Sequence, residues 1–239
     1  LVNLLQGNFG ESFSGRPVWD EIMQAFPVTF RLALIAIIFE IVIGISAGIL
    51  AALNRGGFWD NLVLISTLIV ISIPVFVIGF LAQFTFGIKL GWFPPTVGPN
   101  ATVYELLLPA FVLASLSLAY VARLMRANLT ENLRADYVRT ATSKGLSRQR
   151  VIGRHAVRNS LIPVVTFIGA DFGALLGGAI VTEGIFNIRG IGGLLYLSIR
   201  TREGATVVGV VTVLVLVFLL VNLLVDILYG AIDPRIRYE

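Results

Sequence analysis

Residues 206–230 have the sequence TVVGVVTVLVLVFLLVNLLVDILYG, an apolar run in which Asp226 is the one residue that is charged at pH 7. At 1.5 Å per residue, a helix of this length is about 37 Å long, which exceeds the roughly 30 Å hydrocarbon core of a bilayer. The run therefore predicts a helix that crosses a membrane.

Four more apolar runs of similar length precede this one, at residues 28–53, 61–86, 103–122 and 161–182. Backbone polar groups in hydrocarbon must be hydrogen-bonded within the segment, so each run is predicted to be helical. The runs are too long, and lack the polar alternation, for strands of a membrane β-barrel. The sequence therefore predicts an all-α membrane protein with five transmembrane helices.

The composition agrees with a membrane location and excludes several kinds of site. Hydrophobic residues make up 56% of the chain and charged residues 13%, against about 25% charged in an average soluble domain. Cysteine is absent and His155 is the single histidine, which excludes a thiolate site and any two-histidine metal motif within this sequence. The phosphate-loop pattern G-x-x-x-x-G-K-[ST] is also absent. The G-x-S-x-G pattern at 44–48 lies in mid-span, where its glycines suit helix packing better than a hydrolase turn.

The basic residues indicate which helix ends face the cytoplasm. Nine of the 18 Lys and Arg residues fall between Arg123 and Arg158. Such clustering marks a cytoplasmic loop more often than a nucleic-acid site. The loop 123–160 and the C-terminus are therefore predicted to be cytoplasmic, within a transmembrane domain at 28–239. Residues 1–27 then form an extracytoplasmic segment, and we expect a further helix before residue 1.

Prolines and glycines within the predicted spans have expected effects on helix geometry. A proline removes a backbone donor and tends to kink or start a helix. We therefore expect a kink or a helix start at Pro74, Pro109 and Pro163. Glycines at intervals of four share one helix face and let another backbone approach closely. Gly169, Gly173 and Gly177 have this spacing, which predicts close packing along one face of their helix.

Two acidic residues, Glu40 and Asp171, lie deep in the predicted spans. Ionisable groups in a bilayer are costly and merit a functional hypothesis. These carboxyls either line a water-filled translocation path or pair structurally with other helices, and the sequence alone leaves both alternatives open. A proton relay ranks behind both, because the spans show no chain of such residues.

The polar stretch between Arg123 and Val165 contains signals for two short helices. Asp136 is a candidate cap for a helix from about Tyr137 to Lys144, and Gly145 suits the left-handed residue that ends it. Ser147 is a candidate cap for a second piece that continues into the next span. A short helix between two spans suits docking into a partner's groove, but a solvated loop is an equal alternative on these signals alone.

This stretch resembles the EAA loop of permeases of ATP-binding-cassette (ABC) importers, in the dipeptide/oligopeptide/nickel branch. The matching residues are Asp136-Tyr137-Val138-Arg139-Thr140-Ala141, Lys144-Gly145-Leu146-Ser147, Arg154-His155-Ala156, Arg158-Asn159 and Leu161-Ile162-Pro163. Arg139-Thr140-Ala141 stands where the general motif has Glu-Ala-Ala, which is typical of the peptide branch. Residues 7–12, 15–18 and 233–235 also resemble that branch, whereas Arg189-Gly190-Ile191-Gly192 replaces its usual Pro-Gly-Leu-Gly.

The resemblance implies a type I importer transmembrane domain (MetI-like) whose N-terminal helix is missing from this chain. It implies a multi-pass, non-catalytic pore subunit of a bacterial inner membrane that moves peptides or a related substrate such as a nickel chelate. The implied partners are a homologous second permease, an extracytoplasmic binding protein and two ATPase subunits that bind ATP and Mg, with no nucleic acid.

The resemblance also implies roles for particular residues. Residues 136–141, Lys144 and Gly145 would couple to the ATPase, with Ala141 and Gly145 at close-packed points. The signature residues of the loop are His155, Arg158, Asn159 and Pro163. The alternative function is a secondary transporter or channel independent of ATPases, which predicts inverted halves that are not visible in the sequence.

Overall fold

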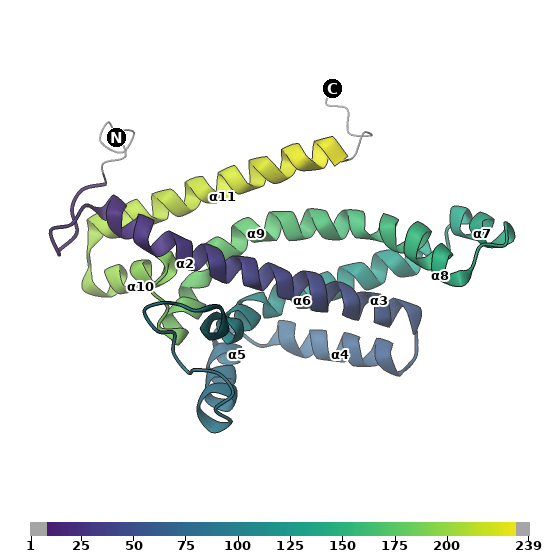
Figure 1. The fold of residues 1–239 in the computed structure, drawn as a ribbon, viewed down its shortest axis with the longest axis horizontal. Coiled ribbons are helices and arrows are strands. Elements are labelled where there is room, and N and C mark those ends of the chain that lie inside the picture. Colours follow the sequence, from purple (N-terminus) through teal and green to yellow (C-terminus); the bar gives the residue numbers. More distant parts are fainter. Residues whose placement is uncertain (1–8, 233–239) are drawn as a thin grey trace. The chain divides into compact units, whose positions relative to one another are not determined.

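The computed structural model describes residues 9–232 (Figure 1). Within that range every regular element is a helix, and the one β-bridge joins Glu11 to Pro17. The all-α prediction is confirmed. The elements in chain order are α2 (Val18–Phe39), η1 (Glu40–Gly44), α3 (Ile45–Leu53), α4 (Phe58–Ser72), α5 (Val75–Ala82), η2 (Gln83–Lys89), α6 (Val103–Asn132), α7 (Asp136–Ser143), α8 (Arg148–Arg150), η3 (Val151–Val157), α9 (Arg158–Phe186), α10 (Ile191–Thr201) and α11 (Gly204–Ile232).

Four stretches of helix are long and apolar enough to cross a membrane, namely Val18–Leu53, Val103–Asn132, Arg148–Gly177 and Gly204–Val225. The first begins ten residues earlier than the apolar run at 28–53, because Pro27 is accommodated inside α2. The second and third also extend beyond the apolar runs, into residues that the sequence assigned to the polar loop. Some residues that resemble the peptide branch lie outside the described range, namely 7, 8 and 233–235.

The second expected span, at residues 61–86, is broken rather than continuous. Helix α4 ends at Ser72, Ile73 has an extended backbone, and α5 begins at Val75. A residue that precedes a proline is sterically disfavoured from a helical backbone conformation, and Pro74 itself has no N–H to donate. The helix therefore stops at this point. Pro109 and Pro163, by contrast, lie inside α6 and α9 without interrupting them.

The chain divides into two compact units. Unit 1 comprises residues 1–36, 75–113 and 172–239, and unit 2 comprises residues 37–74 and 114–171. In unit 1, the start of α2 packs with α10 and α11 through a buried apolar cluster that includes Val18, Ile22, Ile191, Leu195 and Val210.

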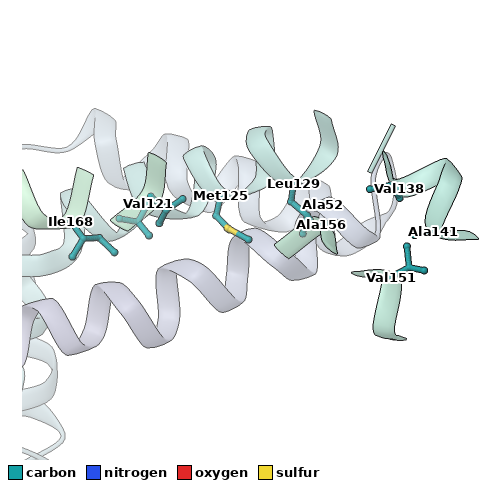
Figure 2. Packing of buried hydrophobic residues seen from close by; sticks show 10 residues of the cluster. Ala52, Val121, Met125, Leu129, Val138, Ala141, Val151, Ala156 and Ile168 are labelled. Atoms are coloured by element: carbon teal, nitrogen blue, oxygen red, sulfur yellow. The ribbon is translucent and has the colours of Figure 1, made fainter. Parts of the chain in front are cut away.

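Unit 2 has a longer apolar cluster, which Figure 2 shows. It runs from Ile168 and Val121 past Met125 and Leu129, and it continues to Val138, Ala141 and Val151. The same cluster thus joins the predicted spans to the short helices of the polar loop. Its members come from α3, α6, α7, η3 and α9.

Glycines set the closest helix approach in unit 2. A Cβ added at Gly48 would lie 2.6 Å from both the Ala122 carbonyl oxygen and the Met125 Cβ. A Cβ at Gly44 would lie 2.8 Å from a Val121 methyl group. The G-x-S-x-G glycines therefore pack α3 and η1 against α6, as predicted.

The expected glycine face of α9 is only partly used. In unit 1, a Cβ at Gly173 would lie 3.1 Å from the Phe218 ring, whereas one at Gly177 would meet no atom within 4 Å. Close packing is therefore confirmed at Gly173 and is not found at Gly177.

Candidate functional site

Helix α7 is the central element of the polar loop in unit 2. Its N-cap residue is Ala135, with an extended backbone (φ −69°, ψ 149°) and no capping side chain. The prediction that Asp136 is the cap was wrong by one residue. Asp136 is instead the first helical residue, exposed and 3.7 Å from Arg139. An exposed ion pair of this kind contributes little stability.

The end of α7 follows the sequence prediction. Gly145 has a positive φ of 77°, the left-handed conformation that glycine adopts without strain. The Leu146 N–H donates to the Ala141 carbonyl at 3.4 Å, and the Gly145 N–H donates to that of Thr142 at 2.9 Å. These two bonds form a Schellman motif, which fixes the direction in which the chain leaves the helix.

The two faces of α7 differ sharply. Val138 and Ala141 are each 6% exposed and pack against the cluster that contains Val151 (Figure 2). Ala141 is therefore packed inside this chain and does not lie on the exposed face of α7. No atom lies within 4 Å of a Cβ placed at Gly145, so that glycine serves backbone conformation rather than close packing. The face that remains free for a partner is polar and exposed: Tyr137, Arg139, Thr140, Ser143 and Lys144.

The second predicted piece of the loop is also helical. Ser147 precedes α8 with an extended backbone, although its side chain makes no capping bond, and α8 and η3 continue into α9. Of the four signature residues, Arg158 and Asn159 are exposed, whereas His155 and Pro163 are half-buried.

A polar network that the sequence analysis missed ties α7 to α6 and α9. The Tyr137 hydroxyl donates to Asn132 Oδ1 at 2.6 Å, and Asn132 Nδ2 lies 3.0 Å from the hydroxyl of Ser160. Ser160 is fully buried and donates to the Ala156 carbonyl at 2.8 Å. Asn132 is the last residue of α6, so this network fixes α7 to the ends of both long helices. The residue types of Asn132 and Ser160 do not predict this hydrogen bond in the sequence, because the fold decides which side chains meet.

A second missed interaction joins α4 to α6. Asp60 is 2% exposed in its side chain and accepts from Arg126 Nε at 2.5 Å and Nη2 at 2.8 Å. The Gly56 N–H donates to the same carboxylate at 2.8 Å. Such a bidentate pair fixes both distance and orientation. An acidic residue at the start of an apolar helix was the available signal in the sequence.

The two deep carboxyls, Glu40 and Asp171, lie side by side in unit 2, with the Ser117 hydroxyl next to Asp171. Glu40 is 0% exposed and therefore does not line an open surface of this chain, whereas Asp171 is half-buried. The arrangement favours the structural-pair alternative for Glu40.

A third buried carboxyl, Glu183, lies in unit 1 and was not singled out from the sequence. It accepts from the Thr29 hydroxyl at 2.6 Å and from the Gly193 N–H at 2.7 Å. Thr29 in turn accepts from the Ile191 N–H at 2.8 Å. Glu183 and Thr29 thus bind the free N–H groups at the start of α10. A Cβ at Gly190 would clash with both side chains, which explains the glycine in Arg189-Gly190-Ile191-Gly192.

Unit 1 also contains an open cavity of about 840 Å³. Glu183 contributes to its wall, but the donors from Thr29 and Gly193 already occupy that carboxylate. Charged side chains of both signs surround the remaining space, namely Arg16, Glu21, Arg189, Arg200 and Glu203.

Comparisons with known proteins place this arrangement in context. The family described as "Binding-protein-dependent transport system inner membrane component" matches residues 44–238. The di/tripeptide transport system permease protein DppB of Pseudomonas aeruginosa is 40% identical, over 99% of this chain and 79% of that protein. The oligopeptide transport system permease protein OppB of Haemophilus influenzae is 38% identical, over 100% and 78%. The glutathione transport system permease protein GsiC of Escherichia coli (strain K12) is 41% identical, over 100% and 78%.

Two solved structures have the same fold. One is the inward-facing MetNI methionine ABC transporter, with a TM-score of 0.74 at 16% identity, over 89% of this chain and 96% of that chain. The other is an amino acid ABC transporter, with a TM-score of 0.64 at 15% identity, over 89% and 94%.

Proposed function

The chain belongs to the family of binding-protein-dependent transport system inner membrane components, the permeases of ABC importers, and we propose that its substrates are short peptides. The observation that carries the proposal is the near-complete alignment, at about 40% identity, with permeases named for di/tripeptides, oligopeptides and glutathione. All three substrates are peptides. A cavity with cationic and anionic side chains is consistent with molecules that carry a free amino group and a free carboxylate.

The proposed role of α7 is to dock into the ATPase. Its buried face is anchored by Val138 and Ala141, which leaves a polar face of about two helical turns for a partner. The Tyr137–Asn132–Ser160 network then links a movement of α7 to α6 and α9. ATP and Mg bind to the ATPase subunits in this scheme, and this chain supplies mechanical contacts without catalysis.

The remaining features of the proposed assembly follow from the same scheme. A second, homologous permease completes the pore, and a binding protein delivers the peptide from outside. The loop 123–160 and the C-terminus lie in the cytoplasm, where the ATPases dock. Alternating access then turns the pore between the two sides.

The docking proposal has a direct test because the chain contains no cysteine. In the assembled complex, Thr140→Cys on the exposed face should crosslink to cysteines engineered in the ATPase groove, with a yield that changes when ATP is added. Ala141→Cys, one residue along but buried, is the matched control and should crosslink poorly. Equal yields at both positions, or none from any exposed site of α7, would rule out this docking face.

The substrate proposal is tested by uptake. Cells that depend on this permease for an essential amino acid should grow on di- and tripeptides that contain it, and excess unlabelled peptide should block uptake of a labelled one. If deletion of the permease leaves growth on peptides unaffected but abolishes nickel uptake, the substrate is a nickel chelate and the peptide proposal is wrong.

A further inference from the structure

Glu40 is enclosed without the donors that an ionised carboxylate requires. It is 0% exposed, and among the described residues neither of its carboxyl oxygens has a hydrogen-bond partner. Asp171 Oδ2, from the neighbouring α9, is likewise enclosed and without a donor. A buried charge that is neither paired nor hydrogen-bonded is strongly unfavourable, and two adjacent carboxylates also repel each other.

The surroundings in unit 2 supply no compensating cation. Among the described residues, neither Glu40 nor Asp171 has a Lys, Arg or His within 4.0 Å. On α6, Arg126 is engaged by Asp60, and Arg123 lies about 9 Å along the helix from Ser117 at 1.5 Å per residue. On α9, Arg158 lies roughly 20 Å along the helix from Asp171. Arg31, earlier on α2, donates to the Pro27 carbonyl of its own helix.

The backbone brings the two carboxyls together by a local change of helix geometry. Glu40 begins η1, a single π-helical turn, and such turns occur often at functional sites. Gly44 ends the same turn and lies against α6, where a Cβ would be 2.8 Å from Val121 and 3.2 Å from the Leu118 carbonyl. This close contact holds the turn, and with it Glu40, against the helix that carries Ser117.

Glu183 is an enclosed glutamate that has the donors Glu40 lacks. It is also 0% exposed, yet its oxygens accept from the Thr29 hydroxyl and the Gly193 N–H. These donors are suited to a carboxylate. Glu40 has no equivalent, and the group next to it, Asp171, is an acceptor unless one of the two carries a proton.

We propose that Glu40 and Asp171 hold one proton between them and form a buried proton-binding site. Glu40 carries the proton, because it is wholly enclosed, and donates to Asp171. Asp171 keeps the single negative charge, because it is only half-buried and lies beside the Ser117 hydroxyl. The proton thereby gives Asp171 a donor and leaves the enclosed Glu40 without a charge.

Infrared spectroscopy of the assembled complex at pH 8 tests the site, because exposed carboxyls are ionised there and only protonated acids give a carboxylic C=O band. Glu40→Gln should remove the intensity of one carboxylic acid per permease chain. Glu183→Gln and the exposed Glu131→Gln are matched controls and should leave that intensity unchanged. Asp171→Asn should keep the band but shift it, because the acceptor of the Glu40 proton changes.

Assembly of the variants provides a second readout. Gln reproduces the shape and the neutrality of the protonated acid, so the Glu40→Gln complex should form with the wild-type yield. If Glu40→Gln removes no carboxylic band, or if it prevents assembly while Glu131→Gln does not, Glu40 is ionised in the native protein and the proposal is overturned.

Discussion

Gly48→Ala is expected to destabilise unit 2 by forcing α3 away from α6. The new Cβ would lie 2.6 Å from the Ala122 carbonyl oxygen and from the Met125 Cβ, against an ordinary contact distance of at least 3.4 Å. Neither atom can turn away, because one belongs to the backbone and the other is fixed to it. The helices must therefore separate by roughly 0.8 Å, the difference between these two distances.

The expected loss of unfolding free energy in Gly48→Ala is the balance of two opposing effects. Overpacking a close interface costs about 1–3 kcal/mol, and a clash with backbone atoms belongs near the upper end of that range. Alanine gains about 1 kcal/mol over glycine in a helix. Gly48→Ala should therefore lose about 2 kcal/mol of unfolding free energy. A Cβ added at Gly153 in η3 meets no atom within 4 Å. Gly153→Ala should therefore raise the unfolding free energy by up to about 1 kcal/mol.

The assay is unfolding of the purified chain in increasing concentrations of SDS, followed by tryptophan fluorescence. Trp59 lies on α4 in the same unit and reports on it. The comparison of interest is the difference between the two alanine variants, about 3 kcal/mol by the estimates above. If Gly48→Ala is as stable as Gly153→Ala, the helices do not meet at Gly48 and the packing described for unit 2 is incorrect.

Three further perturbations address the coupling end of unit 2. Asp60→Asn removes the charge partner of Arg126 and should cost about 1–2 kcal/mol in the same unfolding assay, reduced from the fully buried case because Arg126 is 23% exposed. Gly145→Ala places a Cβ in a left-handed backbone and should cost about 1 kcal/mol, with hydrogen exchange at the end of α7 rising while that of α11 stays unchanged. Tyr137→Phe loses the bond to Asn132 and should lower the stimulation of ATP hydrolysis by substrate in the assembled complex, whereas unchanged stimulation would separate this network from coupling.

Local features of the fold were predictable, because they depend on short stretches of sequence. The apolar runs predicted spans since length and hydropathy are properties of a segment, and the left-handed Gly145 was predictable because few other residues adopt that conformation. The resemblance to importer permeases is confirmed by the family match over residues 44–238 and by relatives of about 40% identity. The alternative of a secondary transporter or channel is set aside by the same findings.

Interactions between distant residues were not predictable in the same way. Asp60 and Arg126 are 66 positions apart, and Asn132 and Ser160 are 28 apart. Their types allow many partners, and the fold decides which one is met. Pro74 indicated a disturbance of its helix, but a proline inside a helix either breaks it, as here, or is accommodated, as Pro109 and Pro163 are. The outcome depends on whether packing in the surroundings holds the helix together.

Glu40 and Glu183 show why residue type alone gives an incomplete account of charge in a membrane protein. Both are glutamates enclosed within helical surroundings, and a hydropathy analysis treats them alike. Glu183 lies where α10 begins, and the free N–H groups of a helix start are a ready set of donors for an anion. Glu40 lies within a continuous stretch of helix, where the backbone N–H groups are already bonded, so donors must come from another side chain or from a proton. The position of each carboxyl relative to a helix terminus therefore decides whether it can remain charged, and the two glutamine variants measure that difference directly.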